Sequence, residues 1–168
     1  QTIFQACERY ERDKSRKDIY LDEDAANYVV SVVESMPHTK GEWQNKPMKL
    51  EDWQFFFYVN VFGWKNSITG YRRFRFADLY IPRKNGKTAM AIPAMLLMFA
   101  VDQEPGAEVF LGATSRDNAK NLLFKPAKYI CSKFEEFKEH FNIEVNASTL
   151  VRSDNDSSLT TVIRNPDD

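Results

Sequence analysis

The sequence Ile81-Pro82-Arg83-Lys84-Asn85-Gly86-Lys87-Thr88 stands near the middle of this 168-residue chain. The run before it, 74–81, is apolar and rich in residues that favour strands, and the run after it, 89–101, is apolar and helix-like. A strand, a tight loop ending in Gly-Lys-Thr and a helix form the context in which this tripeptide binds phosphate. The pattern therefore predicts a phosphate-binding loop.

Each residue type in the loop has a chemical reason to be there. Backbone N–H groups at the start of a helix lack intrahelical acceptors and attract anions. Gly86 lets the backbone approach phosphate oxygens closely. Lys87 can reach β- and γ-phosphates, and the Thr88 hydroxyl can ligate Mg²⁺. We therefore expect the loop to hold the phosphates of a nucleotide together with Mg²⁺.

One position departs from the usual loop pattern. A glycine normally stands five residues before the Gly-Lys pair, and here that position is Ile81. A bare Gly-Lys-Ser/Thr occurs by chance in about one sequence of this length in ten. The alternative is therefore a basic surface turn that happens to contain Gly-Lys-Thr. The strand-like and helix-like flanks favour phosphate binding.

Composition restricts the class of protein. The net charge of −1 gives the whole chain no bulk attraction for nucleic acid or membrane, and 43% hydrophobic residues with 13 Phe indicate about one packed domain. Cys7 and Cys131 have no metal-ligand spacing, and a reduced, cytoplasmic setting is the simplest interpretation. The longest apolar run, 89–101, is too short to span a membrane. The chain starts at Gln1 and stops after a strand-like segment, so we expect a piece of a longer protein.

The first third of the chain is expected to be helical. Alternating charges in 1–18 suggest a solvated helix or arm. Asp22 can cap a helix over 23–36, and a second, aromatic helix over 51–62 is expected to stop at Gly63. Gln54 in this second helix has two interpretations, a side chain that faces water or an amide that contacts the adenine edge.

The middle of the chain predicts a βαβ unit. A first core strand is expected over 71–81, a crossover helix interrupted by Pro93 over 89–101, and a second strand over 108–113. Two strands joined in this way lie in a buried parallel sheet. Between Arg72 and Lys87 there are six positive charges and one negative charge. A positive cluster of this kind attracts phosphate.

The last third changes character after a further helix. This helix is expected to begin at a Thr114 or Ser115 cap and to run to about Phe137, interrupted at Pro126. Short strands over 141–145, 149–152 and 158–164 then predict a hairpin or meander. The expected fold is α/β, with a P-loop NTPase-like parallel sheet flanked by helices, and it is an incomplete domain. Its expected parts are a helical segment (1–63), a βαβ core (64–140) and a β-rich segment (141–168).

Three segments together resemble the large terminase subunit of tailed bacteriophages, the ATP-driven motor that packages DNA into a capsid. They are His38–Trp43 with Leu50–Gln54, the loop Pro82–Thr88, and Leu111–Lys120. The run Arg83-Lys84-Asn85-Gly86-Lys87-Thr88 is the most specific, because the family's variant phosphate loop also lacks the leading glycine and carries an arginine. The resemblance spans about 38–168.

The resemblance implies roles for individual residues. ATP and Mg²⁺ would be held by Pro82, Arg83, Lys84, Asn85, Gly86, Lys87 and Thr88, with Thr88 on the metal. Arg83 and Lys87 would be the catalytic residues, and Arg83 would contact the γ-phosphate. Gln54 would contact adenine. The family's Walker B carboxylates and its endonuclease domain have no counterpart in this sequence.

The resemblance also implies partners and a location. These are double-stranded viral DNA, the portal of the procapsid, the small terminase subunit and further copies in a ring, in the cytoplasm of an infected bacterium and without a membrane. Two alternatives remain open. One is another P-loop translocase, helicase-like ATPase or small-molecule kinase, and the other is a binding module for nucleic acid or protein without nucleotide turnover.

Overall fold

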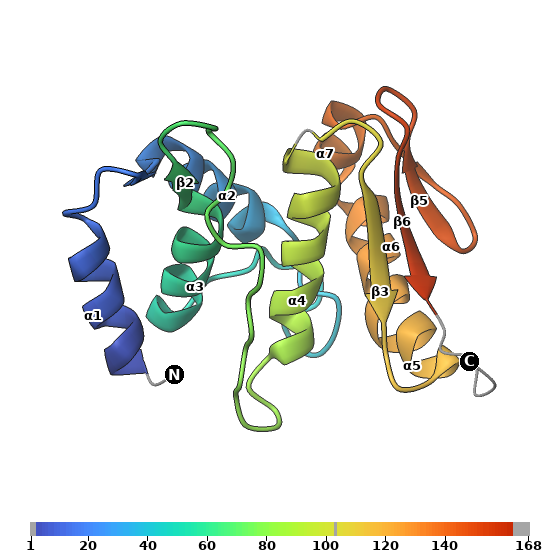
Figure 1. The fold of residues 1–168 in the computed structure, drawn as a ribbon. Helices are drawn as coiled ribbons and strands as arrows, with labels where there is room; N and C mark the ends of the chain where they lie inside the picture. Colours follow the sequence, from blue (N-terminus) through green and yellow to red (C-terminus); the bar gives the residue numbers. More distant parts are fainter. Residues whose placement is uncertain (1–2, 103, 163–168) are drawn as a thin grey trace. The chain divides into compact units, whose positions relative to one another are not determined.

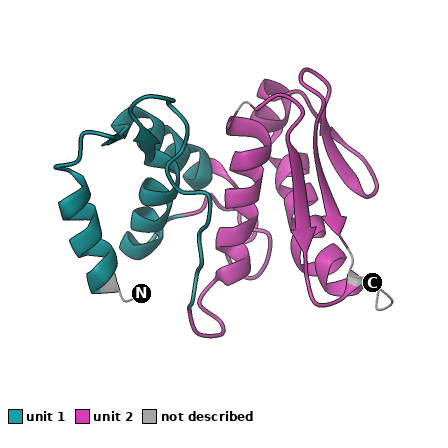
Figure 2. Cartoon of the chain, viewed as in Figure 1, with its two compact units in different colours: residues 1–34, 49–80 teal, residues 35–48, 81–168 magenta. Residues whose placement is uncertain are grey.

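The computed structural model of the chain describes residues 3–102 and 104–162. The chain folds into two compact units (Figure 2). Unit 1 comprises residues 1–34 and 49–80, and unit 2 comprises residues 35–48 and 81–168. The predicted phosphate loop lies in unit 2, whereas the predicted adenine contact Gln54 lies in unit 1.

Unit 1 is built from three helices and a two-stranded ribbon (Figure 1). Its elements are α1 (Ile3–Asp13), β1 (Ile19–Leu21), α2 (Glu23–Ser35), α3 (Asp52–Gly63) and β2 (Trp64–Asn66). β1 and β2 pair antiparallel, with Ile19 opposite Asn66 and Leu21 opposite Trp64. The sequence pattern missed both strands, because three residues are too few to show an alternation.

The two predicted helices of unit 1 are confirmed, and Gly63 has a further role in packing. The Asp22 carboxylate accepts a hydrogen bond from the Ala25 N–H at 2.9 Å, so Asp22 caps α2 as expected. The sequence predicts that this helix stops at Gly63, and α3 does end there. In addition, a Cβ at Gly63 would lie 2.9 Å from side-chain atoms of both Ala26 and Leu21. The glycine is therefore required by close packing against α2 and β1.

The charged N-terminal segment is more than a solvated arm. It forms α1, whose Tyr10 ring packs edge-on against the buried Trp64 ring at 5.7 Å. Asp13 at its end is 1% exposed and accepts a hydrogen bond from Arg73 at 2.5 Å. The Arg73 guanidinium also lies 4.8 Å from the centre of the Phe74 ring. Burial of a carboxylate requires such a partner, and removing one partner of a buried pair typically costs about 3–5 kcal/mol.

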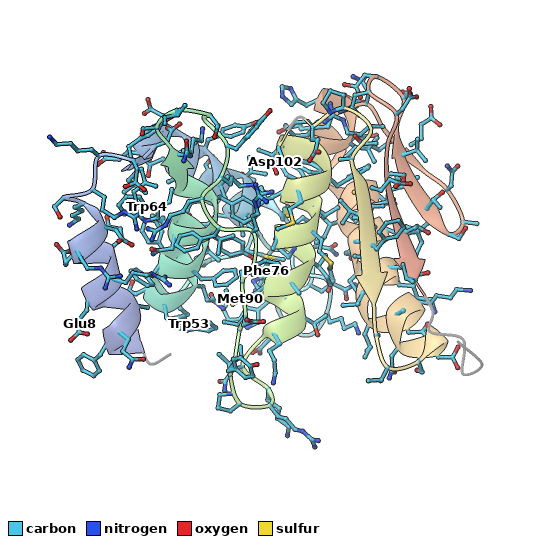
Figure 3. The ribbon with its side chains drawn as sticks, in the orientation of Figure 1. Glu8, Trp53, Trp64, Phe76, Met90 and Asp102 are labelled. Atoms are coloured by element: carbon cyan, nitrogen blue, oxygen red, sulfur yellow. The ribbon has the colours of Figure 1, made fainter. Side chains whose placement is uncertain are left out.

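The expected first core strand over 71–81 is not formed. These residues are extended but belong to none of the strands in the described chain, apart from an isolated backbone bridge between Lys65 and Arg72. Phe76 and Tyr80 are 89% and 92% exposed, and Phe76 projects from this coil in Figure 3. The predicted βαβ unit is therefore wrong in its first strand. A β-rich composition produces a strand only where a second strand accepts its hydrogen bonds.

Unit 2 combines helices with a four-stranded sheet. Its elements are α4 (Lys87–Leu96), η1 (Leu97–Val101), β3 (Glu108–Gly112), α5 (Arg116–Asn118), η2 (Ala119–Phe124), α6 (Lys125–Lys133), α7 (Glu135–His140), β4 (Ile143–Val145), β5 (Thr149–Arg152) and β6 (Ser157–Val162), where η marks π-helical geometry. The strand order is β3-β6-β5-β4. β3 and β6 are parallel, and the other two pairs are antiparallel.

The α/β class is confirmed, and the sheet is mixed rather than parallel. Leu111, Leu150 and Leu159 are almost completely buried, whereas Phe110 is 56% exposed. Alternate residues of each strand point to opposite faces, so one face of the sheet forms the core with the helices. The predicted C-terminal meander corresponds to β4, β5 and β6, and its last positions, 163–164, lie outside the described residues.

The helical runs of unit 2 change geometry at identifiable residues. α4 continues through Pro93 and becomes π-helical at Leu97, so the Asp102 N–H donates to the Leu97 carbonyl at 3.1 Å. The single helix expected over 115–137 is divided into α5, η2, α6 and α7, with a break at Phe134. Cys131 in α6 is fully buried, and burial raises the pKa of its thiol to about 12.

The ion pair between Asp22 and Lys65 predicts a pH dependence of stability. Lys65 donates to the Asp22 carboxylate at 2.7 Å, and this bond, followed by the Ala25 N–H, lowers the pKa of Asp22 below its ordinary value of 3.8. Because the pKa is lower in the folded state, the stabilisation is complete above pH 3.8 and is lost as the pH falls through the folded-state value. Asp22→Asn keeps the cap acceptor and removes the charge.

We expect Asp22→Asn to lower the free energy of unfolding at pH 7 and to approach the wild type as the pH falls below 3.8. Urea denaturation at a series of pH values measures both curves. Asp24→Asn removes an exposed carboxylate from the same turn without touching the Lys65 bond, and serves as the matched control. A wild-type advantage that persists or grows in acid would contradict the assignment.

Candidate phosphate-binding loop

The predicted phosphate loop lies directly before α4. Gly86 occupies the N-cap position with φ 75° and ψ 19°, and Lys87 is the first helical residue. The Gly86 carbonyl accepts the Met90 N–H at 3.0 Å, so the helix starts with a regular first turn. The N–H groups of that first turn have no intrahelical acceptors and carry the positive end of the helix dipole. An anion therefore fits this end of α4.

The loop backbone is left-handed at two positions. Gly86 adopts this conformation at no steric cost, whereas Lys84 has φ 70°, which is uncommon for a residue with a Cβ. Strained backbone of this kind is found preferentially at ligand-binding loops. The sequence carries a signal for the first of these positions, the glycine, and none for the second.

The Lys87 side chain lies back over the loop. Its ammonium donates a hydrogen bond to the Ile81 carbonyl at 2.6 Å. The lysine side chain therefore connects the end of the loop to its first residue. Ile81 is the position at which the usual pattern has glycine, and here its backbone oxygen, not its side chain, makes the contact. Sequence reasoning missed this contact, because a carbonyl acceptor is independent of residue type.

The helix behind the loop is firmly held. Met90, Ile92 and Leu96 of α4 are at most 2% exposed, and α4 packs against α6 and η2 (Figure 3 labels Met90). In contrast, Pro82 to Thr88 are all exposed. The protein thus fixes the helix through its later turns and presents the loop and the first turn to solvent. A ligand can reach the loop without disturbing the core.

The structure brings the predicted loop residues together in one short segment. Pro82, Arg83, Lys84, Asn85, Gly86, Lys87 and Thr88 surround the helix start, and the three cationic side chains among them suit a polyphosphate. Thr88 is the second residue of α4 and is exposed, so its hydroxyl is open to a metal ion bound to the phosphates. Among the described residues, no three His, Cys, Asp or Glu side chains form a metal-binding group.

Gln54 has a local structural role in unit 1. It is the third residue of α3, and its side-chain oxygen accepts the Glu51 N–H at 2.9 Å, which completes half of a capping box. The acceptor of the amide is therefore used by the helix, and the NH₂ group is the part that suits a base. Since Gln54 and the loop belong to different units, its contact with adenine remains a prediction.

These features define an α/β protein with an exposed, cationic loop at the start of a buried helix. The sequence profile of the terminase large subunit, ATPase domain, matches residues 52–167, and the chain belongs to this family. Its ATPase-domain membership implies nucleotide binding. No match was found among curated protein sequences. None of the helices in the described parts of the chain is long and apolar enough to cross a membrane.

A solved structure has the same fold. The chain is similar to the large terminase of bacteriophage HK97, with a TM-score of 0.65 and 20% sequence identity over 82% of this chain. At this identity the likeness establishes the fold, which is the α/β fold expected from the sequence. The matched region is 27% of the length of the HK97 protein, so the chain spans about a quarter of that relative.

The left-handed backbone at Gly86 can be tested against an equivalent glycine. Gly106 lies elsewhere in unit 2 with φ 67°, and a Cβ there would meet nothing within 4 Å. We expect Gly86→Ala and Gly106→Ala each to lower the free energy of unfolding by about 1 kcal/mol, from the strain of a Cβ at positive φ. Only Gly86→Ala is expected to weaken binding of Mg-ATP.

Thermal denaturation and Mg-ATP titration of both variants provide the two measurements. The Gly106→Ala variant separates a general loss of stability from a local change in the loop. Equal losses of affinity in the two variants would show that the conformation of Gly86 has no special part in binding.

Proposed function

We propose that this chain is the ATP-binding part of a phage motor that couples ATP hydrolysis to packaging of double-stranded viral DNA into a procapsid. The observation that supports this most strongly is the Arg83–Thr88 loop at the exposed start of α4, in a chain of the terminase ATPase family. The activity of the whole protein is part of the proposal, since the matched region is a minor fraction of the HK97 relative.

The proposal assigns each loop residue a contact. The N–H groups from Lys84 to Lys87 would cradle the phosphates, and left-handed residues such as Lys84 and Gly86 are typical of backbone concavities that bind anions. Lys87 neutralises the β- and γ-phosphates, Thr88 ligates Mg²⁺, and Arg83 contacts the γ-phosphate. Pro82 and Asn85 shape the turn. Gln54 contacts adenine through its NH₂ group.

Binding exchanges one hydrogen bond for another at Lys87. The ammonium donates to the Ile81 carbonyl at 2.6 Å and would transfer this bond to phosphate oxygens. The exchange leaves no donor unpaired, and the bond to a charged acceptor is stronger than the bond to a carbonyl. The released Ile81 carbonyl faces solvent at the loop, where water replaces the lysine. Little energy is therefore lost when the loop opens for its ligand.

Mg-ATP supplies the phosphoryl group, and this chain supplies binding and charge neutralisation. Arg83 and Lys87 are the catalytic residues in this proposal, because positive charge at the γ-phosphate stabilises the charge that develops during transfer. A carboxylate that orients the attacking water, and the endonuclease centre, would come from sequence outside this chain. Translocation would take place in a ring of copies on the portal, with the small terminase subunit, in the cytoplasm of the infected bacterium.

Removal of the Lys87 ammonium tests the binding site directly. We expect Lys87→Ala to bind Mg-ATP about 10- to 100-fold more weakly than the wild type, because a hydrogen bond to a charged group contributes about 1.5–3 kcal/mol. Isothermal titration calorimetry measures the affinity, and circular dichroism verifies folding. Lys138→Ala, a lysine of α7, is the matched control. A folded wild type that does not bind Mg-ATP would favour the binding-module alternative.

The role of Arg83 predicts a difference between two nucleotides. If its guanidinium contacts only the γ-phosphate, Arg83→Ala should weaken ATP about tenfold or more and leave ADP within about twofold of the wild type. Lys87→Ala should weaken both, because Lys87 also contacts the β-phosphate. Parallel titrations with ATP and ADP give the comparison. An equal loss for both nucleotides in Arg83→Ala would place its contact elsewhere.

A further inference from the structure

A second basic surface in unit 2 is separate in sequence from the phosphate loop. It combines the loop 37–48 with helix α6, and we call it the lysine–tryptophan surface, formed by Trp43, Lys46, Lys125, Tyr129 and Lys133. Trp43 is 56% exposed, and the Lys46 ammonium lies 4.8 Å from the centre of its ring. An exposed indole beside a cation is the kind of side chain that anchors a partner.

The loop that carries Trp43 is tied to itself. The His38 N–H donates to the Lys46 carbonyl at 2.9 Å, and the Asn45 N–H donates to the His38 carbonyl at 3.0 Å. Pro37 and Pro47 form a backbone bridge at the base of the loop. These backbone contacts within a dozen residues leave the chain few alternative conformations. The loop therefore holds Trp43 outward rather than folding it over the core.

Side chains also tie the loop to α6. The Tyr129 hydroxyl donates to the Asn45 side-chain oxygen at 2.6 Å and accepts from the Gln44 amide at 2.9 Å. These two bonds connect residues more than 80 positions apart in sequence. They hold the chain next to Trp43 against α6 and preorganise the loop, which reduces the entropic cost of binding.

The charge of this surface is strongly positive. The loop 37–48 and α6 contain five lysines and one glutamate, a net charge of +4, in a chain with a net charge of −1. Lys125 and Lys133 are exposed one helical turn before and after Tyr129, so they share its face. The next acidic residues, Glu135 and Glu136, begin the following helix α7. A polyanion is the partner that such a surface fits.

From this combination of cations and an exposed indole we infer that the surface binds single-stranded nucleic acid, with a base stacked on Trp43 and phosphates on Lys46, Lys125 and Lys133. Lysines alone suit any polyanion, whereas the exposed ring adds a preference for an unpaired base. Lys46 lies over the ring. A base stacked on this ring would therefore have the Lys46 ammonium near its adjoining phosphate.

The test uses a fluorescently labelled thymidine 12-mer titrated with the whole chain and followed by anisotropy. Trp43→Ala should bind about 5- to 150-fold more weakly, and Trp43→Phe should retain most of the affinity, because stacking needs a ring rather than an indole. A wild type that does not bind the oligonucleotide, or a Trp43→Ala variant with wild-type affinity, would overturn the inference.

The lysines are tested through the salt dependence. Changing Lys46, Lys125 and Lys133 to Ala together should reduce the slope of log affinity against log salt by about 2, since each phosphate contact in a single strand contributes about 0.7. The matched control changes Lys14, Lys17 and Lys138 to Ala. An equal reduction in the control would assign binding to overall charge and refute the surface.

Competition and a loop variant distinguish a nucleic-acid site from an acidic-protein site and from the phosphate loop. A polyglutamate peptide that competes as well as the oligonucleotide, and loses its binding in Trp43→Ala, would reassign the surface to an acidic protein and overturn the inference. Lys87→Ala should bind the oligonucleotide like the wild type, and an equal loss in this variant would place the nucleic acid on the phosphate loop instead. The ATP-binding proposal and the nucleic-acid inference can therefore fail independently of each other.

Discussion

The start of α4 imposes the constraint on which unit 2 is arranged. The helix must begin at Lys87 with its first turn in solvent, while Met90, Ile92 and Leu96 are buried within the next turns. The loop enters the helix through a left-handed residue, and Gly86 adopts this conformation without steric cost. The core then fixes the helix, and the helix fixes the loop. The packing of α4 in the core therefore also determines where the loop lies.

In unit 1, the ion pair between Arg73 and the buried Asp13 connects an exposed segment to the core. Most of the extended residues before the predicted phosphate loop are exposed, and Arg73 ties the start of this segment to Asp13 and to the Trp64 ring. The segment is thus attached to unit 1 at its start and exposed further on, although its composition is typical of a strand. A buried ion pair is weak evidence for stability, because hydrophobic residues of similar volume are often equally stabilising, whereas the geometry of this pair fixes where Arg73 lies.

Much of the architecture could be predicted from local signals. The Asp22 cap, the apolar face of α2, the loop before α4 and the strands β3 to β6 correspond to short-range patterns that need no distant partner. The segment 71–81 could not be predicted in this way, because its strand signal says nothing about whether an adjacent strand exists. Gly63, the Lys87 contact with the Ile81 carbonyl and the left-handed Lys84 depend on neighbours that sequence spacing does not reveal. The family resemblance supplied roles for the loop, not its geometry.

The unequal burial of the two cysteines has a practical consequence for spectroscopy. Alkylating reagents attack the thiolate, and the Cys131 thiol, buried and with a pKa of about 12, stays protonated and shielded at neutral pH. Cys7 in α1 is exposed. A maleimide dye or nitroxide added to the unmodified sequence will therefore attach at a single position. The chain already contains a site for specific labelling in unit 1, and no cysteine has to be removed or introduced.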